Sequence, residues 1–193
     1  MLYLVVFQSA VKGNSDVVIK IENTDNWEQV EPKLLENKEI KYPRLLIFIT
    51  KTLNHQKNIR SGRYVITNKY STLDVVRKLK NGQQDAVNFV INNITFPEQL
   101  ASRVTQKLDI DSTEFLHYIS QPEIAEKYGM NSTNFFGMFL CNTYEIYWNI
   151  SLEKFVDKMH QEYQRFWTAE RIQKATHIGL KPEEVIVLAS IVQ

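Results

Sequence analysis

The residues best suited to chemistry lie in one aromatic stretch, residues 131–148, which reads NSTNFFGMFLCNTYEIYW. Phenylalanine, tyrosine and tryptophan are interspersed there with asparagine and threonine, and Glu145 is the only charged residue. Flat rings pack on the apolar faces of a sugar, while amides and hydroxyls bind its edges. The stretch therefore predicts a sugar-binding groove or, because apolar runs are usually buried, a hydrophobic core loop.

Residues that could hold a metal or a cofactor are scattered. Cys141 is the single cysteine, which excludes an internal disulfide and a cysteine cage for zinc. No His-Glu-x-x-His pattern occurs, so we expect no metal site. The four histidines are His55, His117, His160 and His177. Gly62 and Gly82 are isolated turn residues, not a phosphate-binding glycine loop, so we expect no cofactor.

Composition sets the class of protein. The chain has 193 residues, of which 44% are hydrophobic, enough for one medium domain or two small ones. Basic and acidic residues are nearly balanced, 23 against 22, so there is no basic footprint for nucleic acid.

The last stretch, residues 180–193 (LKPEEVIVLASIVQ), predicts the start of a buried helix. Pro182 suits the first turn, and Glu183 and Glu184 complement the helix dipole. Residues 185–192 are apolar nearly all round, which predicts a position inside a core. Because no polar exit turn or C-cap follows, we expect a fragment of a longer protein, with apolar surface left exposed on this helix.

The first stretch, residues 1–7 (MLYLVVF), is apolar but short. A bilayer span needs about 20 such residues, and the stretch lacks the charged region and cleavage site of a signal peptide. It is either a disordered or packed terminal strand, or the outer end of a membrane anchor.

The N-terminal half predicts a small β-α-α-β unit within residues 16–67. Two β-branched stretches read as strands, and two segments with helical apolar spacing lie between them. The ranges are 16–22, 27–37, 43–53 and 62–67.

The remaining chain predicts one more strand and then mostly helices, so the fold class is α+β. A helix capped by Ser71 or Thr72 ends at Gly82, and residues 85–92 alternate as a strand. Ser112 or Thr113 is the expected cap of a later helix. A long helix follows Ser151, and we expect its aromatic stripe to pack in the core. The stripe is Phe155, Met159, Tyr163 and Phe166.

Four motifs in order resemble those of the endolytic murein transglycosylase family, also called MltG or YceG-like. Residues 61–64 (SGRY) with 81–83 (NGQ) are similar to its pGrY…lrsGkq pattern. Residues 140–144 (LCNTY) stand where most members have Phe-Pro-Asp-Thr-Tyr. Residues 163–167 resemble its aromatic helix, and 189–192 (ASIV) resemble the start of its ASIVEKE signature.

The resemblance implies a domain order and a setting. Residues 1–15 would be the stub of a membrane anchor and a linker, 16–67 a LysM-like subdomain, and 68–193 the N-terminal part of a mostly helical, incomplete catalytic domain. Members are single-pass proteins of the bacterial inner membrane that face the periplasm. They cut nascent peptidoglycan glycan strands, leaving 1,6-anhydro-N-acetylmuramic acid ends. The implied partners are these strands, the cell-wall synthesis machinery and the membrane, without nucleic acid.

The implied chemistry needs one carboxylate, whereas ordinary glycosidases pair two. A single glutamate can protonate O4 of the leaving sugar and then take the proton from the C6 hydroxyl that attacks C1. Such a glutamate needs a raised pKa, which an apolar helix would provide.

The sequence departs from the family pattern at three positions. Gln193 follows Ser-Ile-Val and is not titratable, so the family's acid would lie beyond residue 193 and we expect this chain to be inactive. Cys141 replaces the usual proline. Asn142 replaces the usual aspartate, and it can hydrogen-bond a sugar but cannot act as a base.

The catalytic residue is therefore unassigned, and the resemblance leaves candidates for substrate binding only. They are Asn142, Thr143, Tyr144, Glu145, Ser190 and Gln193. Glu145 is the one carboxylate among them that could assist the reaction, and the competing interpretation is a surface or structural carboxylate.

Two other functions compete with the enzyme. A glycan-binding or scaffolding module without chemistry agrees with the LysM-like half and the missing glutamate. A pyridoxal-phosphate lyase is the second, because relatives of the family have carried an aminodeoxychorismate lyase label. That chemistry needs a lysine in a phosphate-binding pocket, for which the sequence has no context.

Overall fold

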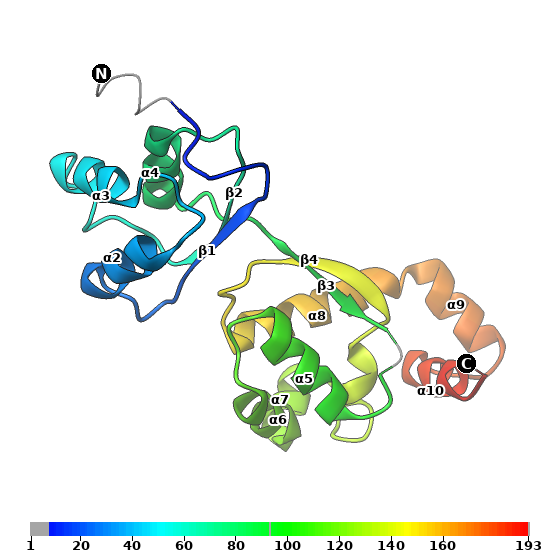
Figure 1. Ribbon diagram of the computed structural model, residues 1–193. Coiled ribbons are helices and arrows are strands. Elements are labelled where there is room, and N and C mark those ends of the chain that lie inside the picture. The colour runs from blue at the N-terminus through cyan, green and yellow to red at the C-terminus, as the bar shows by residue number, and fades with distance from the viewer. Residues whose placement is uncertain (1–7, 93, 193) are drawn as a thin grey trace. The chain divides into compact units, whose positions relative to one another are not determined.

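The computed structural model describes residues 8–92 and 94–192, with side chains described as far as Ala189. The predicted class is confirmed, because helices combine with two small sheets in an α+β fold (Figure 1). The chain divides into two compact units. Unit 1 contains the described residues up to Val87 together with Ile146–Asn149, and unit 2 contains the rest. The predicted anchor stub at residues 1–7 lies outside the described residues.

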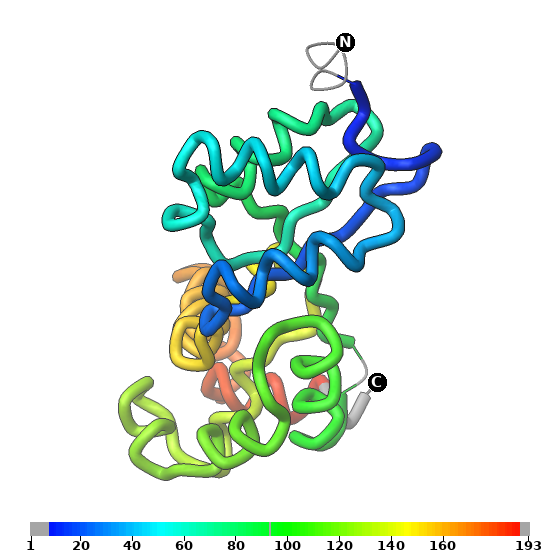
Figure 2. The backbone as a smooth tube through the Cα atoms, turned by 60° about the vertical axis from the view of Figure 1, so that its left-hand side comes forward, coloured from blue at the N-terminus to red at the C-terminus, as the bar shows by residue number. Residues whose placement is uncertain are grey.

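Unit 1 has the predicted β-α-α-β order. Strand β1 (Val17–Ile21) pairs antiparallel with β2 (Gly62–Ile66), and α2 (Trp27–Glu36) and α3 (Pro43–Thr52) lie between them in the chain (Figure 2). Alternate residues of both strands are buried, so one sheet face forms the core against the helices. The core includes Val17, Ile19, Tyr64, Ile66, Leu34 and Leu46.

The compact unit that contains residues 16–67 extends beyond Thr67, because it also contains α4 (Thr72–Asn81). This helix contacts α3 and β2, and its residues Val75, Val76 and Leu79 are fully buried in the unit 1 core. Ser71 caps it by accepting from the backbone of Asp74, as expected, and it ends at a left-handed glycine. Packing of one apolar face of α4 therefore extends the unit to Val87.

The predicted linker is also part of unit 1 where the structure describes it. Ser9 forms a β-bridge with Ser71, and Val11 forms one with Ile40. Ala10 and Val11 are buried in the same core. Residues 9–11 are thus packed against the unit and do not form a free connection.

A second two-stranded sheet pairs β3 (Val87–Ile91) with β4 (Asn142–Ile146). All its residues except Val87 and Ile146 belong to unit 2. The other elements of unit 2 are α5 (Pro97–Lys107), α6 (Ser112–Ser120), α7 (Pro122–Lys127), the 3-10 helix η1 (Phe135–Met138), α8 (Leu152–Phe166), α9 (Ala169–His177) and α10 (Pro182–Val192). The cap of α6 is Asp111, not Ser112 or Thr113, because its carboxylate accepts from the backbone N–H groups of Thr113 and Glu114.

An aromatic cluster forms the core of unit 2. Phe155 on α8 lies edge-on to Phe89 and Phe115, with ring centroids 5.4 and 5.9 Å away, and stacks on Phe139 at 6.4 Å. Much of the stretch 131–148 is buried, as the core-loop interpretation predicts. The expected stripe on α8 is only half right, since Phe155 and Met159 are buried whereas Phe166 is exposed.

Helix α10 is not inside a core where its side chains are described. Val187 is 58% exposed and Leu188 49%, so the prediction of burial is wrong there, while the predicted exposed apolar surface is present. The helix contacts η1, where Gly137 lies beside the side chain of Ile186. Within the described ranges, no helix has the length and apolar character needed to cross a bilayer.

Candidate functional site

The motif strand β4 presents its candidate residues on alternate faces. Tyr144 and Ile146 are buried, while Asn142, Thr143 and Glu145 are exposed. The Tyr144 hydroxyl donates to the Leu140 carbonyl at 2.8 Å, and burial raises the pKa of Tyr144 to about 12. Tyr144 is therefore a neutral core residue that supports the strand, and a sugar could meet only its exposed neighbours.

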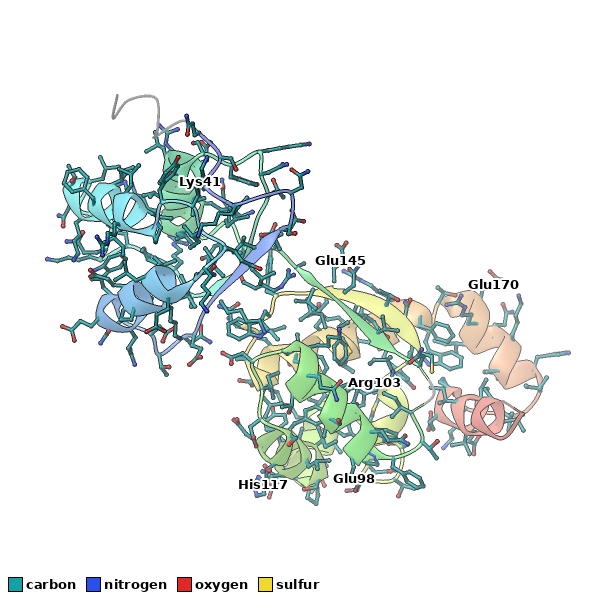
Figure 3. All side chains as sticks on the ribbon, viewed as in Figure 1. Lys41, Glu98, Arg103, His117, Glu145 and Glu170 are labelled. Carbon is teal, nitrogen blue, oxygen red and sulfur yellow. The ribbon has the colours of Figure 1, made fainter. Side chains whose placement is uncertain are left out.

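Glu145 does not have the environment of a general acid. Its side chain projects from β4 and is exposed (Figure 3), whereas a glutamate that serves as both acid and base needs an apolar setting. The structure thus favours the interpretation of a surface carboxylate. Asn142 is held locally, because its side-chain oxygen accepts from the Thr143 backbone at 2.8 Å.

The signature residues lie at the end of α10. Ser190 is within this helix, but its side chain and the whole of Gln193 lie outside the described part. The contact between α10 and η1 brings the helix to the segment that leads into β4. The helix that carries one motif therefore contacts the segment that precedes the other, whereas contact between their candidate side chains stays a prediction.

The glycine motifs in unit 1 form a structural junction. Arg60 N–H donates to the Leu79 carbonyl at 3.2 Å, and the buried Tyr64 hydroxyl donates to the Arg60 carbonyl at 2.6 Å. Gly82 is left-handed, and a Cβ there would lie 2.6 Å from the Arg60 side chain. These contacts give the glycine motif a structural role, because they hold the segment after α4 against the start of β2.

A cavity in unit 2 gathers aromatic and amide groups that the sequence alone did not bring together. It has a volume of about 340 Å³ and lies between the 128–134 loop, the second half of α8, and the starts of α9 and α10. Its polar and aromatic lining includes Tyr128, Asn134, His160, Tyr163, Gln164, Trp167 and Glu183. Only Asn134 belongs to the stretch from which a sugar groove was expected.

One face of α8, with the residue that ends the helix, supplies four of the lining residues. His160, Tyr163, Gln164 and Trp167 are three to four residues apart, so they share a face of the helix. Phe155 and Met159 turn into the core instead. In the sequence these residues form a polar and aromatic stripe beside the apolar one. Because Tyr163 was expected to pack in the core, the stripe was not predicted to line a site.

His160 is held between a tyrosine and an amide. Its ring lies 4.9 Å from that of Tyr128, whose hydroxyl donates to Asp157 at 2.6 Å, and its Nε2 is 3.4 Å from the Gln164 amide nitrogen. Burial and the Asp157 carboxylate hold the pKa of Tyr128 far above its usual range. Burial lowers the pKa of His160, and Asp157 partly opposes this, so the imidazole is neutral at pH 7.

We expect a nuclear magnetic resonance titration of His160 to give a pKa below 6.5. The folded state then binds the proton less firmly than the unfolded chain. The contribution of neutral His160 to the free energy of unfolding is complete above the pKa of the unfolded chain. It is lost as the pH falls through 6.5 towards the pKa of the folded state. Asp157→Asn should lower the midpoint further by removing the opposing charge, and a midpoint at or above 6.5 in the unchanged chain would contradict the burial of this ring.

A second cavity, of about 500 Å³, lies beside α5 and α6 and is lined in part by Glu98 and His117 (Figure 3). Apolar side chains dominate it, including Leu116, Ile119, Phe135 and Phe136. It offers a polyhydroxy ligand fewer polar partners than the first cavity does. Among the described residues, no group of three or more His, Cys, Asp or Glu could hold a metal ion.

Comparison with known proteins gives a family. A sequence model of the YceG-like family matches residues 19–193. A crystal structure described as a yceG-like protein from Listeria monocytogenes matches with a TM-score of 0.52 and 17% sequence identity, covering 92% of this chain and 64% of that one. At that identity the likeness shows a shared fold alone. No curated protein sequence matches.

Proposed function

The chain belongs to the YceG-like family, and from this premise we propose that the protein of which it forms part is a peptidoglycan lytic transglycosylase. Its reaction would cut within nascent glycan strands and leave 1,6-anhydro-N-acetylmuramic acid ends. The observation that carries the proposal is the family match over residues 19–193. The chain spans 64% of the length of the Listeria protein, so the activity proposed is that of the whole protein.

The proposed reaction uses one glutamate in two steps, and the sugar's own C6 hydroxyl is the nucleophile in place of water. The glutamic acid gives its proton to O4 as the C1–O4 bond breaks. The resulting carboxylate takes the proton of the C6 hydroxyl, whose oxygen bonds to C1, so no water is consumed. In this chain Gln193 occupies the first position after Ser-Ile-Val, and an amide cannot perform either step. The acid is thus proposed to lie beyond Gln193.

The setting is part of the same proposal. Glycan strands are the substrate and the cell-wall synthesis machinery the partner, with the protein anchored in the bacterial inner membrane by one N-terminal helix and facing the periplasm. Residues 16–67, the β-α-α-β part of unit 1, would be the LysM-like subdomain that holds the strand. Unit 2 would contribute the exposed face of β4 and the surface around α10.

The test is digestion of purified glycan strands, read by mass spectrometry of the new ends. We expect the full product of the gene to release fragments with 1,6-anhydro ends, each lighter by one water than a hydrolysis product, and the 193-residue chain to release none. Fragments with ordinary reducing ends would identify a hydrolase and overturn the proposal.

A glycan-binding module without chemistry is the second candidate. The observation that favours it is the exposure of Glu145, which leaves the β4 motif without a carboxylate in an apolar setting. Binding of strands by the full gene product, without any new ends, would establish this function.

A further inference from the structure

The cavity beside α8 contains one buried polar atom that lacks an ordinary hydrogen bond to the described part of the chain. Trp167 Nε1 is buried and forms no hydrogen bond of ordinary geometry among the described residues, although it lies close enough to the Tyr163 hydroxyl to interact with it. Glu183 lies close enough to Tyr163 to add to the rise that burial causes in the pKa of this tyrosine. The Tyr163 and Trp167 rings are 6.4 Å apart at 61°, so two aromatic surfaces line the space. A buried indole donor without a full hydrogen bond is costly unless a ligand completes it.

The chemistry of the lining selects a class of ligand. Trp167 is a donor, Glu183 an acceptor, and Gln164 both, while no lysine or arginine of the described part of the chain lines the cavity. An anion would meet the Glu183 carboxylate without a compensating charge, and a wholly apolar ligand would leave the indole donor unpaired. A neutral ligand with hydroxyl groups, an amide and an apolar ring face uses every group.

An acetamido group fits these contacts in particular. Its carbonyl can accept from an indole or amide N–H, its N–H can donate to a carboxylate, and its methyl group suits an apolar neighbour. Met130 and Ile172 are apolar members of the lining. The volume of about 340 Å³ lies at the lower end of the roughly 300–1,000 Å³ typical of small-molecule sites, as suits one sugar ring.

We infer that this cavity is a subsite for one N-acetylated sugar of a glycan strand, remote from the point of cleavage. This inference rests on the proposed function for its substrate class. Glu183 is the second residue of α10 and Val192 its last, so nine residues, or roughly 14 Å of helix rise, separate the cavity from the end where the acid is proposed. A sugar held there is not the reacting one, so the subsite positions the strand.

The test uses the three tryptophans as reporters. Trp27 and Trp148 lie in unit 1 and Trp167 in unit 2, so their indole N–H resonances distinguish binding in the two units. The ¹⁵N-labelled 193-residue chain is titrated with the linear tetramer of N-acetylglucosamine, and the three signals are assigned with single Trp→Phe variants. We expect the Trp167 signal to shift in a saturable way.

A matched pair of variants links the shift to the cavity. Gln164 lines it, whereas Gln161, one turn earlier on α8, does not. Gln164→Ala should raise the Kd read from the Trp167 signal about threefold to tenfold, the loss expected for one neutral hydrogen-bonding group. Gln161→Ala should leave it unchanged, and equal effects of the two variants would overturn the inference.

The outcomes separate this inference from the proposed function. If the Trp167 signal shifts in a saturable way but the full gene product makes no anhydro ends, the sugar subsite is supported and the proposed transglycosylase activity is contradicted. Shifts of the Trp27 and Trp148 signals alone would place the sugar in unit 1 and overturn the subsite, whatever the enzyme assay gives. No shift of any signal would overturn it as well.

Discussion

Phe155→Ala should destabilise unit 2 by about 3–5 kcal/mol, because it leaves a cavity where three phenylalanine rings meet. Phe155 is fully buried and contacts Phe89, Phe115 and Phe139. Edge-to-face pairs of this kind contribute beyond their buried area. Hydrogen exchange read by mass spectrometry measures the loss, since protection should fall across α5, α6 and α8 while β1 and β2 of unit 1 keep theirs.

Phe166→Ala is the matched control on the same helix. Phe166 is exposed, and its ring contacts the Arg171 guanidinium at 4.2 Å and lies edge-on to Trp167 at 5.4 Å, outside the cluster around Phe155. Its loss should cost no more than about 1 kcal/mol, as for an exposed cation–π pair. Equal effects of the two substitutions would mean that the cluster around Phe155 does not hold unit 2 together.

Local signals account for what the sequence predicted correctly. The β-branched alternation of β1 and β2 and the Ser71 cap of α4 each act within a few residues, so pattern reasoning found these elements. The cap of α6 was missed by one position because Asp111, Ser112 and Thr113 are consecutive residues that can all cap, and the Asp111 carboxylate accepts two backbone N–H groups.

Long-range packing accounts for what the sequence did not predict. The end of unit 1 depends on Val75 and Val76 reaching a core built by residues 10–66. Apolar composition predicted burial of α10, but composition does not specify the surface that covers a helix, and Val187 and Leu188 are exposed. The cavity joins residues from the 128–134 loop to Glu183, a separation that no local pattern spans.

The second large effect concerns a buried lysine at the glycine-motif junction. Lys78 on α4 is buried, with its Nζ 2.9 Å from an Asp85 carboxylate oxygen and 4.8 Å from the centre of the Tyr70 ring. The same carboxylate accepts from Val65 N–H at 2.7 Å, so Asp85 joins α4 to β2. Asp85→Ala should cost about 3 kcal/mol, because it leaves an ammonium buried and a backbone donor unpaired. Chemical denaturation followed by circular dichroism measures it.

The burial of the charges, and not the distance between them, determines the loss of stability expected for Asp85→Ala. Lys174 and Glu170 on α9 are closer, at 2.7 Å, but each is 74% exposed (Figure 3 labels Glu170), so Glu170→Ala should cost at most about 0.5 kcal/mol. Replacing Lys78 by methionine in the Asp85→Ala background removes the buried charge and should recover part of the stability, with the Val65 donor still unpaired. A double variant no more stable than Asp85→Ala alone would show that the unpaired Val65 N–H, and not the ammonium, carries the cost.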